Sequence, residues 1–146
     1  MHSLDTIIGP SGSGLPPGAG NAAAGAALFN RRCQSCHGRA GRGGQGGELA
    51  GGHADLTRAS PDQNVGTYWP YATTLFDFVR RAMPMDAPWS LTDDEVYAVT
   101  AYILHLNGLL DATVELNAEI LLRLRMPNRG GFIGIEADPQ LSRHPR

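Results

Sequence analysis

A cysteine pair followed directly by a histidine constrains this chain more than any other feature. Cys33, Cys36 and His37 stand in the pentapeptide Cys-Gln-Ser-Cys-His. The chain has only these two cysteines, so the further ligands of a zinc site built from cysteine pairs are missing. No βαβ pattern surrounds the motif, as it would in a thioredoxin-like dithiol protein. Two thioethers and an adjacent imidazole are instead typical of covalent haem attachment, so the sequence predicts one haem c with His37 as an iron ligand.

An iron that shuttles electrons benefits from a second protein ligand, and a methionine sulfur raises its reduction potential. Met83 is favoured because it lies between two predicted helices and because Pro84 removes a backbone donor and stiffens the loop. Met126 follows the last strongly predicted helix, where a role in the core or in a contact is expected. Besides Met83, four side chains with suitable donor atoms stay open as the second ligand: Met85, Met126, His53 and His105.

Helical patterns surround these candidate ligands. An alanine-rich helix is predicted over residues 22–32, capped by Asn21, and a second helix over residues 71–82. The capping box at residues 92–95 opens the best helix, which Asn107 and Gly108 end. A short helix is predicted over residues 114–124, and the glycine-rich residues 41–52 predict a loop that passes close to the haem.

The length of 146 residues suits one domain, and 19 glycines with 10 prolines predict many turns. The predicted fold is mainly α, with an extended surface arm at residues 1–20, a cytochrome domain at 21–110 and a C-terminal extension at 111–146. A net charge of -2 argues against strong nonspecific attraction to nucleic acid. No apolar run approaches the roughly 20 residues of a membrane span. The polar start indicates a mature or recombinant form whose targeting segment is missing.

Spacing around the motif resembles that of class I cytochromes c. In that family a glycine, an aromatic residue and the first haem cysteine follow one another at intervals of four, as Gly25, Phe29 and Cys33 do here. The resemblance implies that the C-terminal helix crosses closely at Gly25 and brings an aromatic ring, for which Tyr102 is the match. It also implies the class I cytochrome c fold, in which a glycine inside a helix serves close packing.

A narrower resemblance covers most of the chain and points to the SoxD-like cytochrome subunits of sulfane or sulfite dehydrogenases. It rests on residues 14–18 (GLPPG), 65–72 (VGTYWPYA), 80–84 (RRAMP), 90–98 (SLTDDEVYA) and 125–128 (RMPN). The resemblance implies that Met83 is the axial ligand. It further implies a SoxC-type partner subunit with a molybdenum cofactor. Thioether attachment at CxxCH, with no cysteine left over, separately predicts the bacterial periplasm. This chain has one CxxCH motif, whereas some of these relatives carry a second haem domain.

Other polar and aromatic side chains are candidates for the haem surroundings. Tyr68 and Trp69 could wall the haem or donate to a propionate. Arg80 and Arg81 could neutralise propionates, form a docking patch or belong to a solvated helix face. Asp93 and Asp94 are explained by the start of a helix, where the dipole favours carboxylates.

No acid–base pair for substrate chemistry is apparent, so no catalytic residue is expected. The predicted function is electron transfer from a molybdenum subunit to another c-type carrier. Three alternatives remain open: a free electron shuttle, a haem enzyme or gas sensor with an open iron position, and a haem-free thiol protein.

Overall fold

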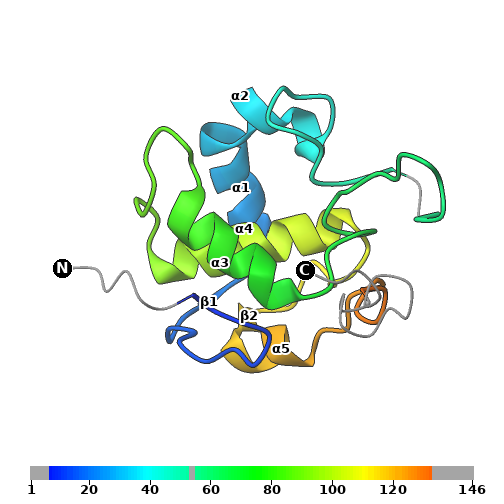
Figure 1. Ribbon diagram of the computed structural model, residues 1–146. Helices are drawn as coiled ribbons and strands as arrows, with labels where there is room; N and C mark the ends of the chain where they lie inside the picture. Colours follow the sequence, from blue (N-terminus) through cyan, green and yellow to red (C-terminus); the bar gives the residue numbers. More distant parts are fainter. Residues whose placement is uncertain (1–6, 53–54, 133–146) are drawn as a thin grey trace, which may run out of the picture.

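The computed structural model describes residues 7–52 and 55–132, which form a mainly helical fold (Figure 1). The long helices are α1 (Ala22–Arg32), α3 (Ala72–Ala82) and α4 (Asp93–Leu106). Shorter elements complete the fold: β1 (Ala19–Gly20), α2 (Gln34–His37), the 3-10 turn η1 (Arg39–Gly41), β2 (Leu116–Asn117) and α5 (Ala118–Arg123). The predicted mainly α architecture is therefore confirmed. None of the described helices is long and apolar enough to cross a membrane.

Helix α1 crosses α4 at Gly25, as the sequence predicts. Asn21 caps the helix by accepting a hydrogen bond from the Ala24 N–H at 3.0 Å. A Cβ atom on Gly25 would lie 1.9 Å from the Ala98 carbonyl oxygen, so only glycine lets the backbones come this close. One turn later, the rings of Phe29 and Tyr102 meet edge to face at 5.3 Å. The crossing fixes the end of α1 from which the CxxCH motif continues.

Helix α4 runs through the core between α1 and α3. Its start is fixed by the predicted capping box, in which Thr92 and Glu95 exchange side-chain and backbone hydrogen bonds at 2.8 and 3.2 Å. Phe76 of α3 packs on Tyr97 of α4 with ring centroids 4.5 Å apart, and both side chains are fully buried. Helix α3 begins one residue later than predicted, because Tyr71 is its extended N-cap.

The segment before α1 contributes to the core, which differs from the predicted surface arm. Ile8 is 2% exposed, and its N–H donates to the buried Asp77 carboxylate of α3 at 3.1 Å. Tyr97 donates its hydroxyl proton to the Pro16 carbonyl at 2.8 Å. Further on, Ala19 and Gly20 form β1, and a Cβ on Gly20 would lie within 2.4 Å of the Ala98 nitrogen. Apolar burial and these long-range hydrogen bonds therefore hold the segment in the fold.

The segment after α4 returns to the segment that precedes α1. Strand β2 pairs antiparallel with β1, with Ala19 opposite Asn117 and Gly20 opposite Leu116 (Figure 1). This pairing shortens the helix predicted over residues 114–124, which begins only at Ala118. Asn117 caps it by accepting from the Ile120 N–H at 3.0 Å. The sequence pattern missed the pairing because it depends on a partner strand from the other end of the chain.

Candidate haem site

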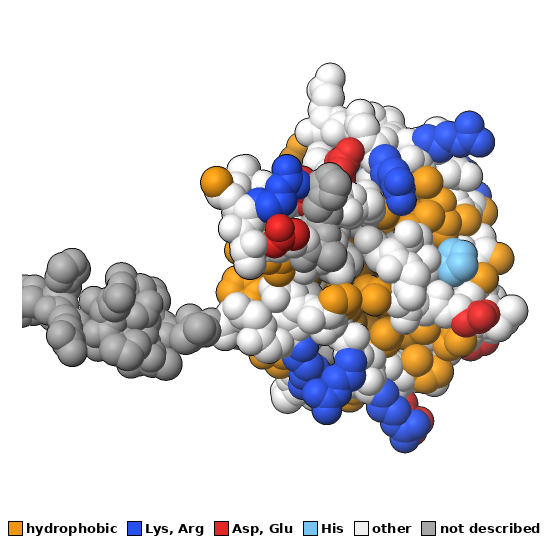
Figure 2. Space-filling model, turned by 90° about the vertical axis from the view of Figure 1, so that its right-hand side faces the viewer, with side chains coloured by type: hydrophobic (Ala, Val, Ile, Leu, Met, Phe, Trp, Pro, Cys, Tyr) orange, Lys and Arg blue, Asp and Glu red, His pale blue; other side chains and the backbone are white. Residues whose placement is uncertain are grey.

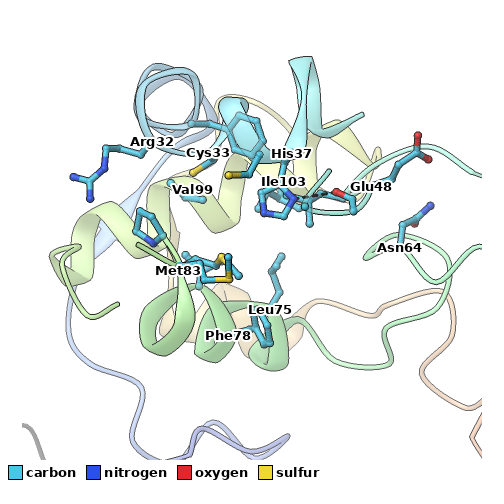
Figure 3. Close-up of a pocket in the computed structure, with 18 of the residues that line it drawn as sticks. Arg32, Cys33, His37, Glu48, Asn64, Leu75, Phe78, Met83, Val99 and Ile103 are labelled. Atoms are coloured by element: carbon cyan, nitrogen blue, oxygen red, sulfur yellow. Dashed lines mark hydrogen bonds between the residues drawn. The ribbon is translucent and has the colours of Figure 1, made fainter. Parts of the chain in front are cut away.

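A cavity of about 680 Å³ lies between the long helices and the loops that follow α2. Its walls are mostly apolar, with Phe29 from α1, Leu75 and Val79 from α3, and Val99 and Ile103 from α4. Figure 3 shows Cys33 and His37 on one side of the cavity and Met83, Leu75 and Phe78 on the opposite side. Pockets of about 300–1,000 Å³ with apolar walls and a few placed polar groups are typical of cofactor sites.

The imidazole of His37 is held in a defined orientation. His37 is 9% exposed, and its Nδ1 lies 3.0 Å from the Gly47 carbonyl oxygen (Figure 3). Because a carbonyl can only accept, Nδ1 carries the proton, and Nε2 keeps the lone pair that a metal needs. A backbone carbonyl on the second ring nitrogen is the usual partner of a metal-bound histidine.

The glycine-rich loop predicted near the haem does lie against the CxxCH turn. The Gly46 N–H donates to the Cys36 carbonyl at 2.7 Å. A Cβ on Gly44 would lie 2.1 Å from that same oxygen, and a Cβ on Gly46 would lie 3.1 Å from His37 Cε1. A side chain at Gly44 or Gly46 would therefore push the loop away from the CxxCH turn. The glycines predicted the close approach, but no sequence signal marked Gly47 as the acceptor, since every residue has a carbonyl.

Both cysteines line the cavity, and Figure 3 shows Cys33 on the same side as His37. At the end of α1, the Cys33 N–H donates a hydrogen bond to the Phe29 carbonyl at 2.8 Å. In the turn of α2, the His37 N–H donates to the Cys33 carbonyl at 2.9 Å. Neither cysteine is in a disulfide. Burial raises the pKa of the Cys33 thiol, with Arg32 opposing the shift. Reactive dithiols depend on a lowered thiol pKa, so the environment favours anchors for a cofactor over a redox dithiol.

The candidate second ligands are distributed unevenly. Met83 directly follows α3, and its N–H donates a hydrogen bond to the Val79 carbonyl at 3.3 Å. Its side chain lines the cavity opposite His37. Met85 also lines the cavity but is 78% exposed. Met126 is 3% exposed in the hydrophobic core, as expected for a core role, and does not line the cavity. His105 is exposed, with Nδ1 3.0 Å from the Leu110 carbonyl oxygen, and His53 lies outside the described residues.

The two aromatic candidates are separated by the structure. Trp69 lines the cavity and meets Phe78 edge to face at 5.9 Å. Tyr68 does not line it, because its ring packs on Phe132 at 5.1 Å. The structure therefore favours Trp69 over Tyr68 as the haem wall, because contact with the C-terminal extension orients the Tyr68 ring.

Arg80 and Arg81 do not line the cavity either. Arg81 donates twice to the Asp77 carboxylate, at 2.9 and 2.6 Å, and these hydrogen bonds raise the pKa of its guanidinium. Arg80 lies 3.4 Å from the Asp93 carboxylate and 5.5 Å from the Trp89 ring centroid. Both guanidinium groups thus have partners on the protein, Arg81 within α3 and Arg80 on Asp93 of α4 and on Trp89, which disfavours the alternative role on propionates.

Among the polar lining residues that sequence reasoning missed, Asn64 and Arg32 make hydrogen bonds across the cavity's edges. Asn64 is 3% exposed, and its side-chain oxygen accepts from the N–H groups of Gly66 and Thr67 at 3.0 and 3.1 Å. Its amide donates to the Gly51 carbonyl, which ties the two loops of the cavity together. Arg32 donates to the Ser90 hydroxyl at 3.1 Å across the gap between α1 and the loop before α4. An asparagine two residues before a glycine is a turn signal, but it does not reveal which cavity the turn borders.

The donor set fits haem c. Two thiols and an imidazole on one side, a thioether on the other, and apolar walls between them are the groups that haem of this type requires. Among the described residues, no group of three or more His, Cys, Asp and Glu side chains is placed to hold a metal ion by itself.

Comparisons with known proteins agree with this geometry. The sequence profile described as Cytochrome c matches residues 22–107. A chain in the crystal structure of the sulfane dehydrogenase SoxCD from Paracoccus pantotrophus is 38% identical, with a TM-score of 0.86. The match covers 98% of the present chain and 73% of that chain. The comparison with curated proteins gave no significant match.

Proposed function

The chain belongs to the cytochrome c family, and we propose that it carries one covalent haem c and moves single electrons for a sulfite or sulfane dehydrogenase. One observation carries the proposal: the imidazole of His37 and the thioether of Met83 lie on opposite sides of an apolar cavity that both motif cysteines line. Bound haem c supplies an iron that gains and loses one electron. The protein side chains anchor the haem, ligate its iron and exclude water from it.

Each side chain has a separate task in this proposal. Cys33 and Cys36 anchor the porphyrin through thioethers, and His37 offers Nε2 to the iron. The Gly47 carbonyl holds the imidazole and increases its basicity. Met83 offers sulfur, which favours the reduced state. The apolar side chains of α3 and α4 exclude water, so that the iron environment changes little between the two oxidation states.

The partner is inferred from the similarity to a chain of the sulfane dehydrogenase SoxCD. We infer that this cytochrome accepts electrons from a SoxC-like subunit with a molybdenum cofactor and passes them to a c-type carrier. Exposed apolar side chains at the cavity support a protein contact there, because Phe78 is 43% and Met85 is 78% exposed. The face in Figure 2 also carries a broad area of hydrophobic side chains, with basic groups at its edges. Polar rims of this kind steer encounter more than they set affinity.

Haem attachment through CxxCH, with no further cysteine, also favours the bacterial periplasm. Cell fractionation of the native host tests this point. Recovery of the haem-loaded chain in the cytoplasmic fraction would contradict it.

The haem proposal is tested by mass and by absorption spectra. Intact mass in denaturant should exceed the polypeptide mass by one haem when the host attaches haem to other cytochromes. The oxidised protein should show the sulfur-to-iron charge-transfer band, which Met83→Ala should abolish. Met85→Ala is the matched control and should keep the band. Loss of the band in Met85→Ala alone would assign the ligand to Met85, and rapid carbon monoxide binding by the unchanged protein would favour a sensor or enzyme.

The partner proposal needs a separate experiment. The haem-loaded chain is mixed with a SoxC-like molybdenum subunit from the same host, and sulfite or a sulfane-carrying protein is added. The haem absorption should change to that of the reduced form only when the molybdenum subunit is present. Equally fast reduction without that subunit would contradict the partner while leaving the haem proposal intact.

A further inference from the structure

We propose that the C-terminal segment of residues 126–132 positions Trp69 against the haem cavity and that Asn128 is the positioning residue. The inference rests on the proposed haem site, and it assigns to the extension a task in setting the reduction potential.

The C-terminal segment contacts Tyr68, directly before Trp69, and Tyr71, two residues after it. Asn128 donates its side-chain amide to the Tyr68 carbonyl at 2.7 Å, across 60 positions of sequence. The ring of Phe132 packs edge to face on that of Tyr68, with an interplanar angle of 84°. After Trp69, the Arg129 guanidinium lies 5.3 Å from the centroid of the Tyr71 ring.

Met126 anchors the segment itself. Its side chain is 3% exposed and belongs to the hydrophobic core, so the residues that follow start from a fixed point. The Arg129 N–H then donates to the Met126 carbonyl at 3.1 Å, and the Gly131 N–H donates to the Asn128 carbonyl at 3.1 Å. These two turns direct Asn128 toward the loop. A Cβ on Gly131 would lie 1.7 Å from Asn128 Oδ1. The turn can therefore hold the Asn128 side chain in this position only because residue 131 is a glycine.

Trp69 transmits this support to the cavity. Its ring lines the cavity together with Phe78, which it meets edge to face at an interplanar angle of 75°. Within the loop that leads to Trp69, the Tyr68 N–H donates to the backbone carbonyl of Asn64 at 3.0 Å. Tyr68 is thus fixed at its N–H from within the loop and at its carbonyl from the extension. Without the second bond, the Trp69 side of the loop is freer to move.

Movement of this wall should change the reduction potential. Haem potentials depend on solvent access and on the polarity of the surrounding shell. A loosened Trp69 admits water to the side of the cavity that Met83 occupies, and water favours the more highly charged oxidised iron. The potential should therefore fall, while the covalent attachment and the axial ligands stay the same.

The experiment compares variants of the full haem-loaded chain. Asn128→Ala removes the donor to Tyr68, and Phe132→Ala removes the ring contact. Arg123→Ala is the matched control, because it lies in the same extension and loses only an exposed ion pair with Glu119. The reduction potential is measured by redox titration, the Met83 ligation by the charge-transfer band, and the stability by urea unfolding. Asn128→Ala and Phe132→Ala should lower the potential with the band retained, and Arg123→Ala should leave the potential unchanged.

A double-mutant cycle separates positioning from general loosening. Trp69→Ala should lower the potential by itself, and adding Asn128→Ala to it should lower the potential little further. Wild-type potentials in both Asn128→Ala and Phe132→Ala would overturn the inference, even if both variants were less stable. Full additivity with Trp69→Ala would overturn it too. A wild-type chain without covalent haem would instead overturn the proposed function, and this inference with it.

Discussion

The two ends of the molecule are built on different principles. At the closed end, formed by residues 7–20, β2 and α5, protein atoms fill the space and Ile8, Leu116 and Leu121 are at most 2% exposed (Figure 1). At the open end, around the cavity, comparable apolar side chains surround about 680 Å³ that no protein atom fills. The closed end is therefore packed by the polypeptide itself, whereas the open end surrounds a cavity whose volume and apolar walls suit a cofactor.

Tight backbone contacts at the helix crossing fix the position of the haem motif. Gly20 and Gly25 both approach Ala98 on α4, closer than any side chain would allow. They fix the position of α1 relative to α4 from the closed end. The motif at the end of α1 is thus presented to the cavity by packing that does not itself involve the cavity.

The largest expected effect comes from removing the haem anchors. In the double variant Cys33→Ala/Cys36→Ala the haem is no longer attached, and the apolar side chains that line the cavity lose their burial against it. Exposing a buried apolar side chain costs about 1.5–3 kcal/mol, so the exposure of several of them approaches the whole stability of a typical domain, about 5–15 kcal/mol. Far-ultraviolet circular dichroism and limited proteolysis should show loss of most helical structure. Ser35→Ala, within the same motif, should keep haem and structure, and a fully folded double variant would show that the open end does not need the cofactor.

The next largest effect is expected at the crossing that joins the two ends. Gly25→Ala places a Cβ against the Ala98 carbonyl and forces α1 away from α4, which should cost about 3 kcal/mol or more. Urea unfolding of the haem-loaded protein measures this loss. Gly9→Ala is the control, because a Cβ there meets nothing within 4 Å. Equal stability of the two variants would mean that the helices can separate without cost.

A change confined to the closed end should lower stability without touching the spectrum. Leu121→Ala opens a cavity under α5, where the side chain is 1% exposed, and should cost about 2–4 kcal/mol. The neighbouring Leu122→Ala should cost far less, since Leu122 is 41% exposed. Both proteins should keep the wild-type haem absorption spectrum. A shifted spectrum in Leu121→Ala would show that the closed end and the haem cavity are not independent.

The smallest effect concerns one hydrogen bond and its pH dependence. Tyr97→Phe removes the bond to the Pro16 carbonyl and should cost about 1 kcal/mol at neutral pH. Burial, followed by the nearby Asp93, raises the pKa of Tyr97 above its usual value of about 10. The folded state therefore favours the protonated phenol, and its stabilisation is complete below pH 10 and lost as pH rises further.

Urea unfolding at pH 8 to 11 should show a smaller loss of stability in Tyr97→Phe than in the wild type. The control Tyr102→Phe should retain the wild-type decline. An unchanged slope in Tyr97→Phe would assign the alkaline loss to other groups.

The helices that surround the cavity could be predicted because their signals are local. Asn21 and the Thr92–Glu95 capping box place two helix starts within a few residues, and the CxxCH motif places the cofactor. The closed end could not be predicted in the same way. The pairing of β1 with β2 and the Asp77 bond to Ile8 join positions far apart in the chain, and no periodicity encodes them.

Within the candidate site, side-chain chemistry was predictable and backbone geometry was not. Met83 and Trp69 were named from their residue types and neighbours, and both line the cavity. Tyr68 packs on Phe132 and does not line the cavity, and the sequence does not tell which of two neighbouring aromatic rings in this turn faces it. The Gly47 carbonyl, which orients His37, has no side chain that could have marked it.

The pairing of β1 with β2 also has a consequence for the order of folding. The two strands are separated in the sequence by α1, α3 and α4. Contacts that close so long a loop are slow to form. We therefore expect the strand pair to form after the local helical contacts, so that the last link of the closed end is made between the two segments that flank the helices.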